Sequence, residues 1–226
     1  MVKIGVVLGS KESTFAKDPH YSIEIRYFEA LEKAGAIAIP VTYSNIDKQL
    51  DELDGVLLPG GDFYTPSIYY TEEQNNPYVD TGIWFEGFVG AGSYALANNI
   101  PLLGICGGMQ VLAILLGGKL AMGVDDHRFE DNKELAHSIE IEKDSILYNI
   151  FKQDKVMTNS IHREQVAEVN KNIKVTAAAE DGVIEAIEST KHDFAVGLQW
   201  HPECLVADGN EQQLSIFKHF VDICKK

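Results

Sequence analysis

A cysteine lies in a short glycine-rich segment whose context favours catalysis. Gly104-Ile-Cys-Gly-Gly-Met-Gln110 places Cys106 between a predicted apolar strand and a predicted helix. A nucleophile at such a turn is exposed at the carboxyl edge of a sheet, and its neighbours must be small because the backbone there is crowded. The helix N-terminus favours the thiolate, and the N–H of Gly107 can donate to an oxyanion. These features predict a nucleophile, whereas an isolated cysteine is more often a small buried packing residue.

A histidine and a glutamate follow the last predicted strand and can supply the base that a thiol needs. Residues 195–200 run as a strand into His201-Pro202-Glu203. Pro202 fixes its own φ and restricts the residue before it, which holds the imidazole of His201 at the strand end. Glu203 can accept from one ring nitrogen and so turn the other toward the thiol. We therefore predict Cys106, His201 and Glu203 as the catalytic residues, although sequence alone does not show that they meet.

The elements that must position these residues alternate in the first half as βαβ units do. Short apolar runs predict strands, and amphipathic runs predict helices, in the order 4–8 (strand), 21–34 (helix), 36–41 (strand), 55–58 (strand), 84–98 (helix), 100–105 (strand) and 107–116 (helix). The continuous apolar run 100–105 is typical of a central strand buried on both faces. Residues 60–77 show neither period and predict a long loop, in which Gly60 or Gly61 would supply a second oxyanion donor.

The second half contains short predicted strands with few helices between them. The strands are expected at 138–141, 173–177, 183–187 and 194–199, before a last amphipathic helix at 211–223. We find no repeat or linker that would divide the chain. The pattern predicts an α/β fold: one three-layer domain over residues 1–226, with a mostly parallel central sheet flanked by helices and a smaller antiparallel portion in the second half.

The composition excludes nucleic acid as an expected partner. The chain has 226 residues, 45% hydrophobic and 23% charged, which is typical of a soluble globular protein. Its formal charge of -15 would repel a phosphate backbone, and its densest basic stretches are only pairs.

The sequence also predicts a cytoplasmic protein without a membrane segment or a metal. The start lacks the features of a signal peptide, and the apolar run 111–116 is far shorter than the ~20 residues that span a bilayer. Three cysteines are too few and too uneven for a disulfide framework. The remaining histidines show no ligand spacing such as His-x-x-x-His, so we expect no metal and no cofactor.

Three motifs resemble those of the class I glutamine amidotransferase-like superfamily, in the same order. They are Pro59-Gly-Gly-Asp, Gly104-Ile-Cys-Gly-Gly-Met-Gln110 and Gln199-Trp-His-Pro-Glu203. With Asp181-Gly-Val-Ile-Glu-Ala-Ile-Glu188, the chain is most similar to the γ-glutamyl-γ-aminobutyrate hydrolase group, the C26 peptidases. Asn159-Ser-Ile-His162 is similar to the family segment beside the glutamyl pocket, and residues 64–70 to the loop after the oxyanion strand.

The resemblance implies a flavodoxin-like fold and hydrolysis of γ-glutamyl amide bonds through a γ-glutamyl thioester, without a cofactor. It implies an oxyanion hole of Gly107 with Gly60 or Gly61, and it implies that Gln110, Ser160 and Ile161 bind the glutamyl part. His162 would either contact the substrate or cap a strand. The chain departs from many group members, which have Arg at the position of Gly107 and His-His-Gln in place of His162-Arg163-Glu164.

Two alternatives remain open from the sequence. One is a glutaminase subunit that delivers ammonia to a separate synthase, and the other is a non-catalytic binding or sensing protein on the same fold. The expected partner is a small γ-glutamyl substrate. The sequence leaves open the leaving amine, a homodimer and, under the first alternative, a synthase partner.

Overall fold

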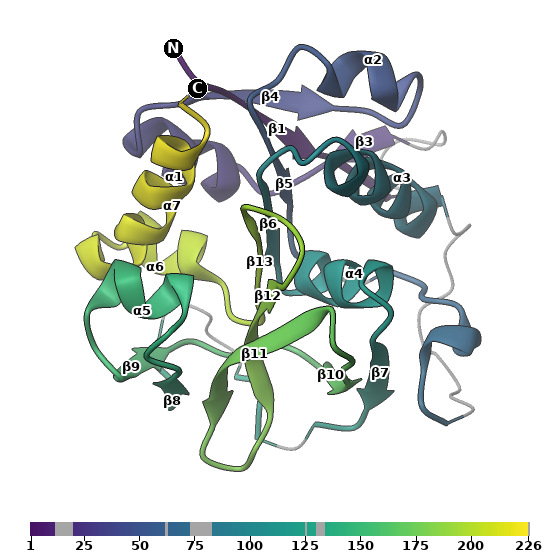
Figure 1. Ribbon diagram of the computed structural model, residues 1–226. Coiled ribbons are helices and arrows are strands. Elements are labelled where there is room, and N and C mark those ends of the chain that lie inside the picture. Colours follow the sequence, from purple (N-terminus) through teal and green to yellow (C-terminus); the bar gives the residue numbers. More distant parts are fainter. Residues whose placement is uncertain (12–19, 62, 73–82, 125, 130–133, 226) are drawn as a thin grey trace.

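A twisted sheet runs through the middle of the molecule, with helices on both faces (Figure 1). The computed structural model describes residues 1–11, 20–61, 63–72, 83–124, 126–129 and 134–225. Within these residues nine strands form the sheet, in the spatial order β4 (Ile37–Val41), β1 (Lys3–Val7), β5 (Gly55–Leu58), β6 (Leu102–Ile105), β13 (Ala195–Leu198), β12 (Ile184–Ser189), β11 (Ile173–Ala179), β8 (His137–Ile141) and β9 (Lys155–Thr158).

The sheet has a parallel and an antiparallel part. Neighbouring strands are parallel from β4 to β13 and antiparallel from β13 to β9. Numbered along the chain, the five parallel strands have the order 2-1-3-4-5 of flavodoxin-like folds, in which ligands bind outside the carboxyl ends of the strands. The predicted fold class, with its smaller antiparallel portion in the second half, is confirmed.

Each face of the sheet has its own hydrophobic core. One face is covered by α1 (Arg26–Lys33), α5 (Ile146–Phe151), α6 (Pro202–Ala207) and α7 (Glu211–Ile223), and the other by α2 (Ile46–Leu50), α3 (Ile83–Ala97) and α4 (Gly107–Leu115) (Figure 1). Ile4 and Phe217 are fully buried in the first core, and Leu58 and Phe88 in the second. The apolar runs of β1, β5, β6 and β13 are thus buried on both sides, as their composition predicts, whereas the edge strand β4 is only partly buried.

The sequence patterns missed the shorter elements and one helix boundary. The helix predicted at 21–34 begins at Arg26, because β3 (His20–Ser22) pairs with β2 (Gly9–Lys11). A second small pair joins β7 (Lys119–Met122) to β10 (Glu164–Glu168), and the predicted loop contains the 3-10 helix η1 (Ser67–Tyr69). Asp62 and residues 73–77 of that loop lie outside the described residues. The other elements that the patterns did not predict are α2, α5, α6 and β9, each four to six residues long. Such short runs give no clear period.

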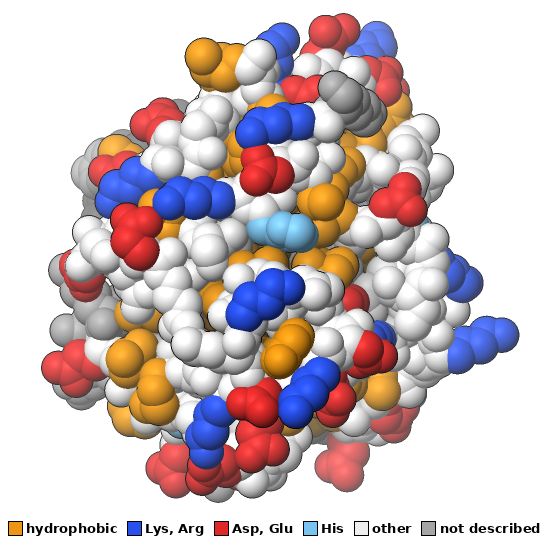
Figure 2. Space-filling model, turned by 60° about the vertical axis from the view of Figure 1, so that its left-hand side comes forward, with side chains coloured by type: hydrophobic (Ala, Val, Ile, Leu, Met, Phe, Trp, Pro, Cys, Tyr) orange, Lys and Arg blue, Asp and Glu red, His pale blue; other side chains and the backbone are white. Residues whose placement is uncertain are grey.

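The surface carries charges of both signs. On the face shown in Figure 2, Lys and Arg side chains are interspersed with Asp and Glu. No helix among the described residues combines the length and the apolarity needed to cross a bilayer.

Gly108 is expected to be essential for stability, because its Cα packs directly on the backbone of β5. A Cβ at this position would lie 2.0 Å from the carbonyl oxygen of Leu58. Since no real contact is that short, Gly108→Ala must displace α4 from the sheet, and we expect the free energy of unfolding to fall by about 3 kcal/mol. Urea denaturation measures this change.

Gly90→Ala is the matched control, since Gly90 lies in α3 and a Cβ there would meet nothing within 4 Å. Alanine in a helix interior is favoured over glycine by about 1 kcal/mol, so this variant should be at least as stable as the parent. Equal losses in the two variants would contradict the close packing of Gly108.

Candidate active site

Cys106 stands in a strained turn between β6 and α4. It is the N-cap residue of α4, with φ 49° and ψ −107°. Few non-glycine residues adopt such a positive φ, and those that do are often found at functional sites. Its backbone N–H donates to the carbonyl of Leu198 at 2.7 Å, and its carbonyl accepts from Gln110 at 3.1 Å, so the turn is held from both sides. The predicted strand-turn-helix geometry is confirmed.

His201 and Glu203 are held together at the carboxyl end of β13. His201 is the N-cap residue of α6, and Pro202 occupies the first position of that helix, where its missing N–H costs nothing. Nδ1 of His201 lies 2.6 Å from Oε1 of Glu203, whose side chain is fully buried. The amide of Asn159 fixes the backbone of His201 through two hydrogen bonds of 2.9 Å. The imidazole therefore has one orientation.

The structure brings the predicted base to the predicted nucleophile. The side chains of His201 and Cys106 line the same cavity, where both lie against the backbone of Gly60. Burial of the imidazole disfavours its charged form, but the negative charges of Glu203 and Cys106 outweigh burial and raise the pKa of His201 well above its ordinary value. The arrangement can therefore hold a proton on His201 beside the sulfur.

The glycines predicted for the oxyanion hole surround Cys106. A Cβ on Gly60 would lie 2.5 Å from Cε1 of His201 and 3.2 Å from Cβ of Cys106, so this backbone touches both residues. A Cβ on Gly107 would lie 2.8 Å from the carbonyl oxygen of Gly61. The segment after β5 and the start of α4 are thus pressed together, and any side chain at position 107 would push them apart.

Tyr27 belongs to the site, although no sequence motif indicated it. Its hydroxyl accepts a hydrogen bond from the N–H of Gly60 at 2.8 Å and lies 3.4 Å from Nδ1 of His201. Burial, followed by the charges of Glu203 and Cys106, raises the pKa of Tyr27 well above its ordinary value, so the phenol stays neutral. The residue comes from α1, and its only signal in the sequence is a place on the buried face of that helix.

Tyr27→Phe is expected to lower kcat about tenfold and to leave KM nearly unchanged, because loss of one hydrogen bond frees the Gly60 backbone beside Cys106. Steady-state kinetics measures the split. Tyr148→Phe, on α5 and away from the cavity, is the control and should match the parent. A Tyr27→Phe variant that changes KM alone would place the hydroxyl in substrate binding instead.

Cys204 is not a second nucleophile. It is fully buried, and burial together with the charge of Glu203 raises the pKa of its thiol to about 12. Nη1 of Arg26 donates to its sulfur at 3.2 Å. The prediction that Cys204 and Cys224 are packing residues agrees with their burial in the structure.

A cavity of about 350 Å³ opens beside Cys106 and His201. Of the residues predicted to bind substrate, Ile161 and His162 line this cavity, and Gln110 lines a smaller adjoining one. Ser160 lines neither, because its buried hydroxyl donates to the carbonyl of His127 at 2.9 Å. The wall also includes three charged residues, of which the sequence analysis had named only Arg163: Glu24, Arg128 and Arg163.

The fold and this arrangement at the sheet edge define a glutamine amidotransferase-like domain. Two solved structures share the fold. The glutaminase domain of Trypanosoma brucei CTPS with bound acivicin superimposes with a TM-score of 0.70 at 20% identity, over 99% of this chain and 94% of that chain. A protein described as a GMP synthase subunit from Thermoplasma acidophilum gives 0.69 at 19% identity with the same coverage.

The chain belongs to the Peptidase C26 family, whose model matches residues 4–203. A glutamine amidotransferase-like protein of Rickettsia prowazekii is 30% identical over 94% of this chain and 92% of its own length. A glutamine amidotransferase of Schizosaccharomyces pombe is 32% identical, with coverages of 88% and 81%. The γ-glutamyl-γ-aminobutyrate hydrolase PuuD of Escherichia coli is 27% identical, with coverages of 90% and 87%. The resemblance seen in the motifs is confirmed, and the family implies hydrolase activity on carbon–nitrogen bonds.

Proposed function

We propose that the chain is a cysteine-dependent hydrolase of γ-glutamyl amide bonds. The observation that carries this proposal is the arrangement in which Glu203, 2.6 Å from the ring of His201, holds that ring in the cavity that Cys106 also lines, with the sulfur at a helix N-terminus. This is the geometry of an activated thiol nucleophile with an oriented base.

The proposed reaction has two acyl transfers. The sulfur of Cys106 attacks the amide carbonyl carbon, and His201 then gives its proton to the nitrogen as the carbon–nitrogen bond breaks. This leaves a γ-glutamyl thioester and a free amine. Water next attacks the thioester while His201 accepts its proton, and the carbon–sulfur bond breaks to release glutamate and restore the thiolate beside protonated His201.

The oxyanion of each intermediate would be held by backbone donors around Cys106. The N–H of Gly107 at the start of α4 is one. The second comes from the Gly60-Gly61 segment, whose backbone is in contact with both catalytic side chains. Because the N–H of Gly60 donates to Tyr27 in the structure, Gly61 is the simpler candidate for this donor.

The charges of the cavity suit a glutamyl group. Its α-carboxylate is negative and its α-ammonium is positive, and the wall offers Arg128, Arg163 and Glu24. Guanidinium groups bind carboxylates through paired hydrogen bonds. We therefore place the zwitterionic end of the substrate at these residues, with the γ-amide at Cys106.

A panel of γ-glutamyl compounds tests the proposal. Glutamine, γ-glutamyl-γ-aminobutyrate and polyglutamylated substrates are compared by kcat/KM with the purified chain, and α-linked glutamyl amides serve as controls. We expect turnover of γ-linked compounds only. Equal turnover of α-linked amides, or none of any member, would sink the assignment.

An ammonia-donating subunit is the second candidate, favoured by the fold match to a glutaminase domain and by relatives described as glutamine amidotransferases. Such subunits are usually slow without their synthase. Slow hydrolysis restricted to glutamine would support this candidate, and robust hydrolysis of larger γ-glutamyl amides would exclude it.

A non-catalytic binding protein is the candidate from another class, and labelling with iodoacetamide tests it directly. A thiolate reacts much faster than a buried thiol, so Cys106 should be alkylated first and selectively. Uniform or absent labelling of the three cysteines would favour the non-catalytic role.

A further inference from the structure

A cluster of three histidines surrounds a buried glutamate behind the active-site cavity. Oε1 of Glu185, on β12, lies 3.1 Å from Nδ1 of His127 and 3.5 Å from Nε2 of both His137 and His162. Nδ1 of His127 is also 3.1 Å from Nε2 of His162. The proposed reaction uses neither Glu185 nor His127 nor His137. This cluster therefore needs an explanation of its own.

In each of the three histidines, one ring nitrogen points toward Glu185 and the other points away from it. The contacts of the nitrogen that points away show which nitrogen carries the proton. Nε2 of His127 faces the carboxylate of Asp181 at 2.9 Å, and Nδ1 of His162 faces the carbonyl of Glu164 at 2.9 Å. Nδ1 of His137 faces the carbonyl of Ser138 at 3.4 Å. A ring nitrogen that faces an oxygen acceptor carries the proton in a neutral imidazole.

The inward nitrogens then present lone pairs to one another and to the carboxylate. Glu185 is fully buried, and within the described part of the chain neither of its carboxylate oxygens has a hydrogen-bond partner of good geometry. The same holds for Nε2 of His137. A buried carboxylate in this state is costly unless a cation lies beside it.

We propose that this cluster binds a divalent transition metal, with Zn²⁺ the best match. The ligands would be His127, His137, His162 and Glu185. Bonds of about 2.0–2.1 Å in a tetrahedron separate neighbouring ligand atoms by about 3.4 Å, close to the separations around Oε1 of Glu185. His127, His137 and Glu185 have donor atoms within 4.8 Å of one another. His162 is outside that group but lies against His127 and Glu185, so its ring would shift toward His137 to complete the tetrahedron.

The outer contacts are those of a metal site. Ligating histidines commonly donate their second N–H to a carboxylate or a backbone carbonyl, which fixes the ring and raises its basicity. Asp181 and the carbonyls of Glu164 and Ser138 fill these positions. The three imidazole nitrogens and the single carboxylate favour zinc over calcium or magnesium, which require mostly oxygen ligands.

The site would connect four segments that are distant in sequence. It joins the segment of His127, β8, the segment of His162 and β12. Arg128 and Arg163 each follow a proposed ligand and line the active-site cavity. A bound ion would therefore fix the wall of that cavity without touching Cys106.

Metal loading of the whole chain tests the assignment and does not depend on the proposed hydrolase activity. The chain is stripped with a chelator, its Cys106 is alkylated with iodoacetamide, and Zn²⁺ or Co²⁺ is added back. We expect one equivalent of Zn²⁺ by elemental analysis, a higher Tm with the metal, and the visible absorption of tetrahedral Co²⁺ with nitrogen and oxygen ligands.

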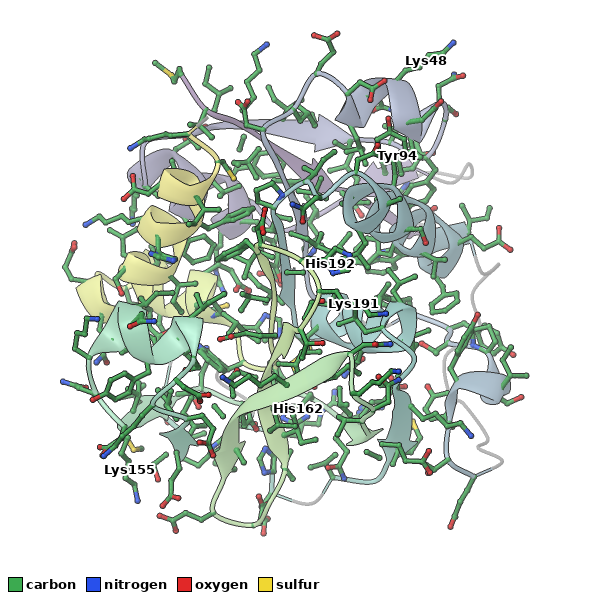
Figure 3. The ribbon with its side chains drawn as sticks, viewed as in Figure 1. Lys48, Tyr94, Lys155, His162, Lys191 and His192 are labelled. Carbon is green, nitrogen blue, oxygen red and sulfur yellow. The ribbon has the colours of Figure 1, made fainter. Side chains whose placement is uncertain are left out.

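Variants locate the ion. Glu185→Gln should abolish stoichiometric binding. Asp181→Asn, at a half-exposed outer position, should fold normally and weaken binding roughly 10–100-fold. His192→Gln is the matched control and should bind like the parent, because Figure 3 shows His192 apart from His162 and its ring contacts Ser189.

Three results would overturn the assignment. The first is no metal above trace in the parent chain, which would mean that a shared proton holds the cluster together. The second is unchanged binding in Asp181→Asn together with Glu185→Gln. The third is a thiolate-to-Co²⁺ charge-transfer band. The described residues contain one other group of ligand-type side chains, formed by His201, Glu203 and Cys204. Such a band would therefore place the ion on Cys204.

Discussion

Cys106→Ala is expected to lower kcat by at least roughly 10⁴-fold, because no other group can form the acyl intermediate. The thiol is the attacking atom, and the second cysteine near the site, Cys204, is held as a thiol with a pKa of about 12. Alanine removes only the sulfur, and Cys106 lines the active-site cavity, where loss of one atom leaves the surrounding packing in place. The fold should therefore survive, because alanine keeps the Cβ and with it the same backbone strain at φ 49°, so α4 has no reason to rearrange.

The measurement is single-turnover and steady-state hydrolysis of the best γ-glutamyl substrate, with circular dichroism and Tm as checks of folding. Cys224→Ala is the control for loss of a buried thiol, since Cys224 lies in the core at the end of α7 and does not line the cavity. Only Cys106→Ala should lose activity. A folded Cys106→Ala variant that retains a tenth of the parent rate would show that hydrolysis does not use this thiol.

The active-site residues were predictable because each lies in a local motif. Gly108 must be glycine because a Cβ would meet Leu58, and Pro202 marks the start of α6 after β13. Local sequence thus records both strand ends, and the parallel sheet brings Cys106 and His201 to one edge. The contact of the two side chains, however, required the strand order, which no local pattern contains.

Tyr27 and the histidine cluster were not predictable for the same reason. Tyr27 reaches Gly60 and His201 from a helix that is far from both motifs in the sequence, and an amphipathic helix offers many buried positions. The ligand-type residues of the cluster come from four separate segments. A search for His-x-x-x-His spacing finds only ligands on one helix, so it does not detect a site built from separate segments.

Gly107 is a position at which the chain departs from the family pattern, and the packing around it explains this departure in part. Many members of the γ-glutamyl-γ-aminobutyrate hydrolase group have arginine there, and in this chain the position packs against the carbonyl of Gly61 and the ring of Phe63. A larger residue would have to move that segment. The second oxyanion donor and the residue after the nucleophile are therefore coupled, so the shape of this cavity differs from one built around an arginine.

Glu203→Gln is expected to lower kcat roughly 10³- to 10⁴-fold while the cavity keeps its shape. The carboxylate accepts from Nδ1 of His201 at 2.6 Å and fixes the tautomer that leaves the other nitrogen for Cys106. A glutamine amide can present its NH₂ to the ring and stabilise the wrong tautomer. It also removes a buried negative charge that raises the pKa of His201.

The loss of the Glu203 charge should also change the pH profile of kcat/KM in a defined direction. His201 must be protonated to expel the amine, so activity is lost as pH rises through its pKa. In the parent that pKa lies well above its ordinary value, and removing the charge of Glu203 lowers it. The alkaline limb of the profile should therefore move to lower pH in Glu203→Gln.

Glu188→Gln is the control that distinguishes the pH shift caused by losing Glu203 from the general effect of losing a buried carboxylate. Glu188 is nearly as buried, and its Oε1 accepts from the N–H of Ile146 at 2.7 Å at the start of α5, a contact that glutamine can keep. Its profile should overlay that of the parent. If Glu203→Gln left the alkaline limb in place, His201 would not be the group that titrates there, and the proton that expels the amine would have to come from another residue.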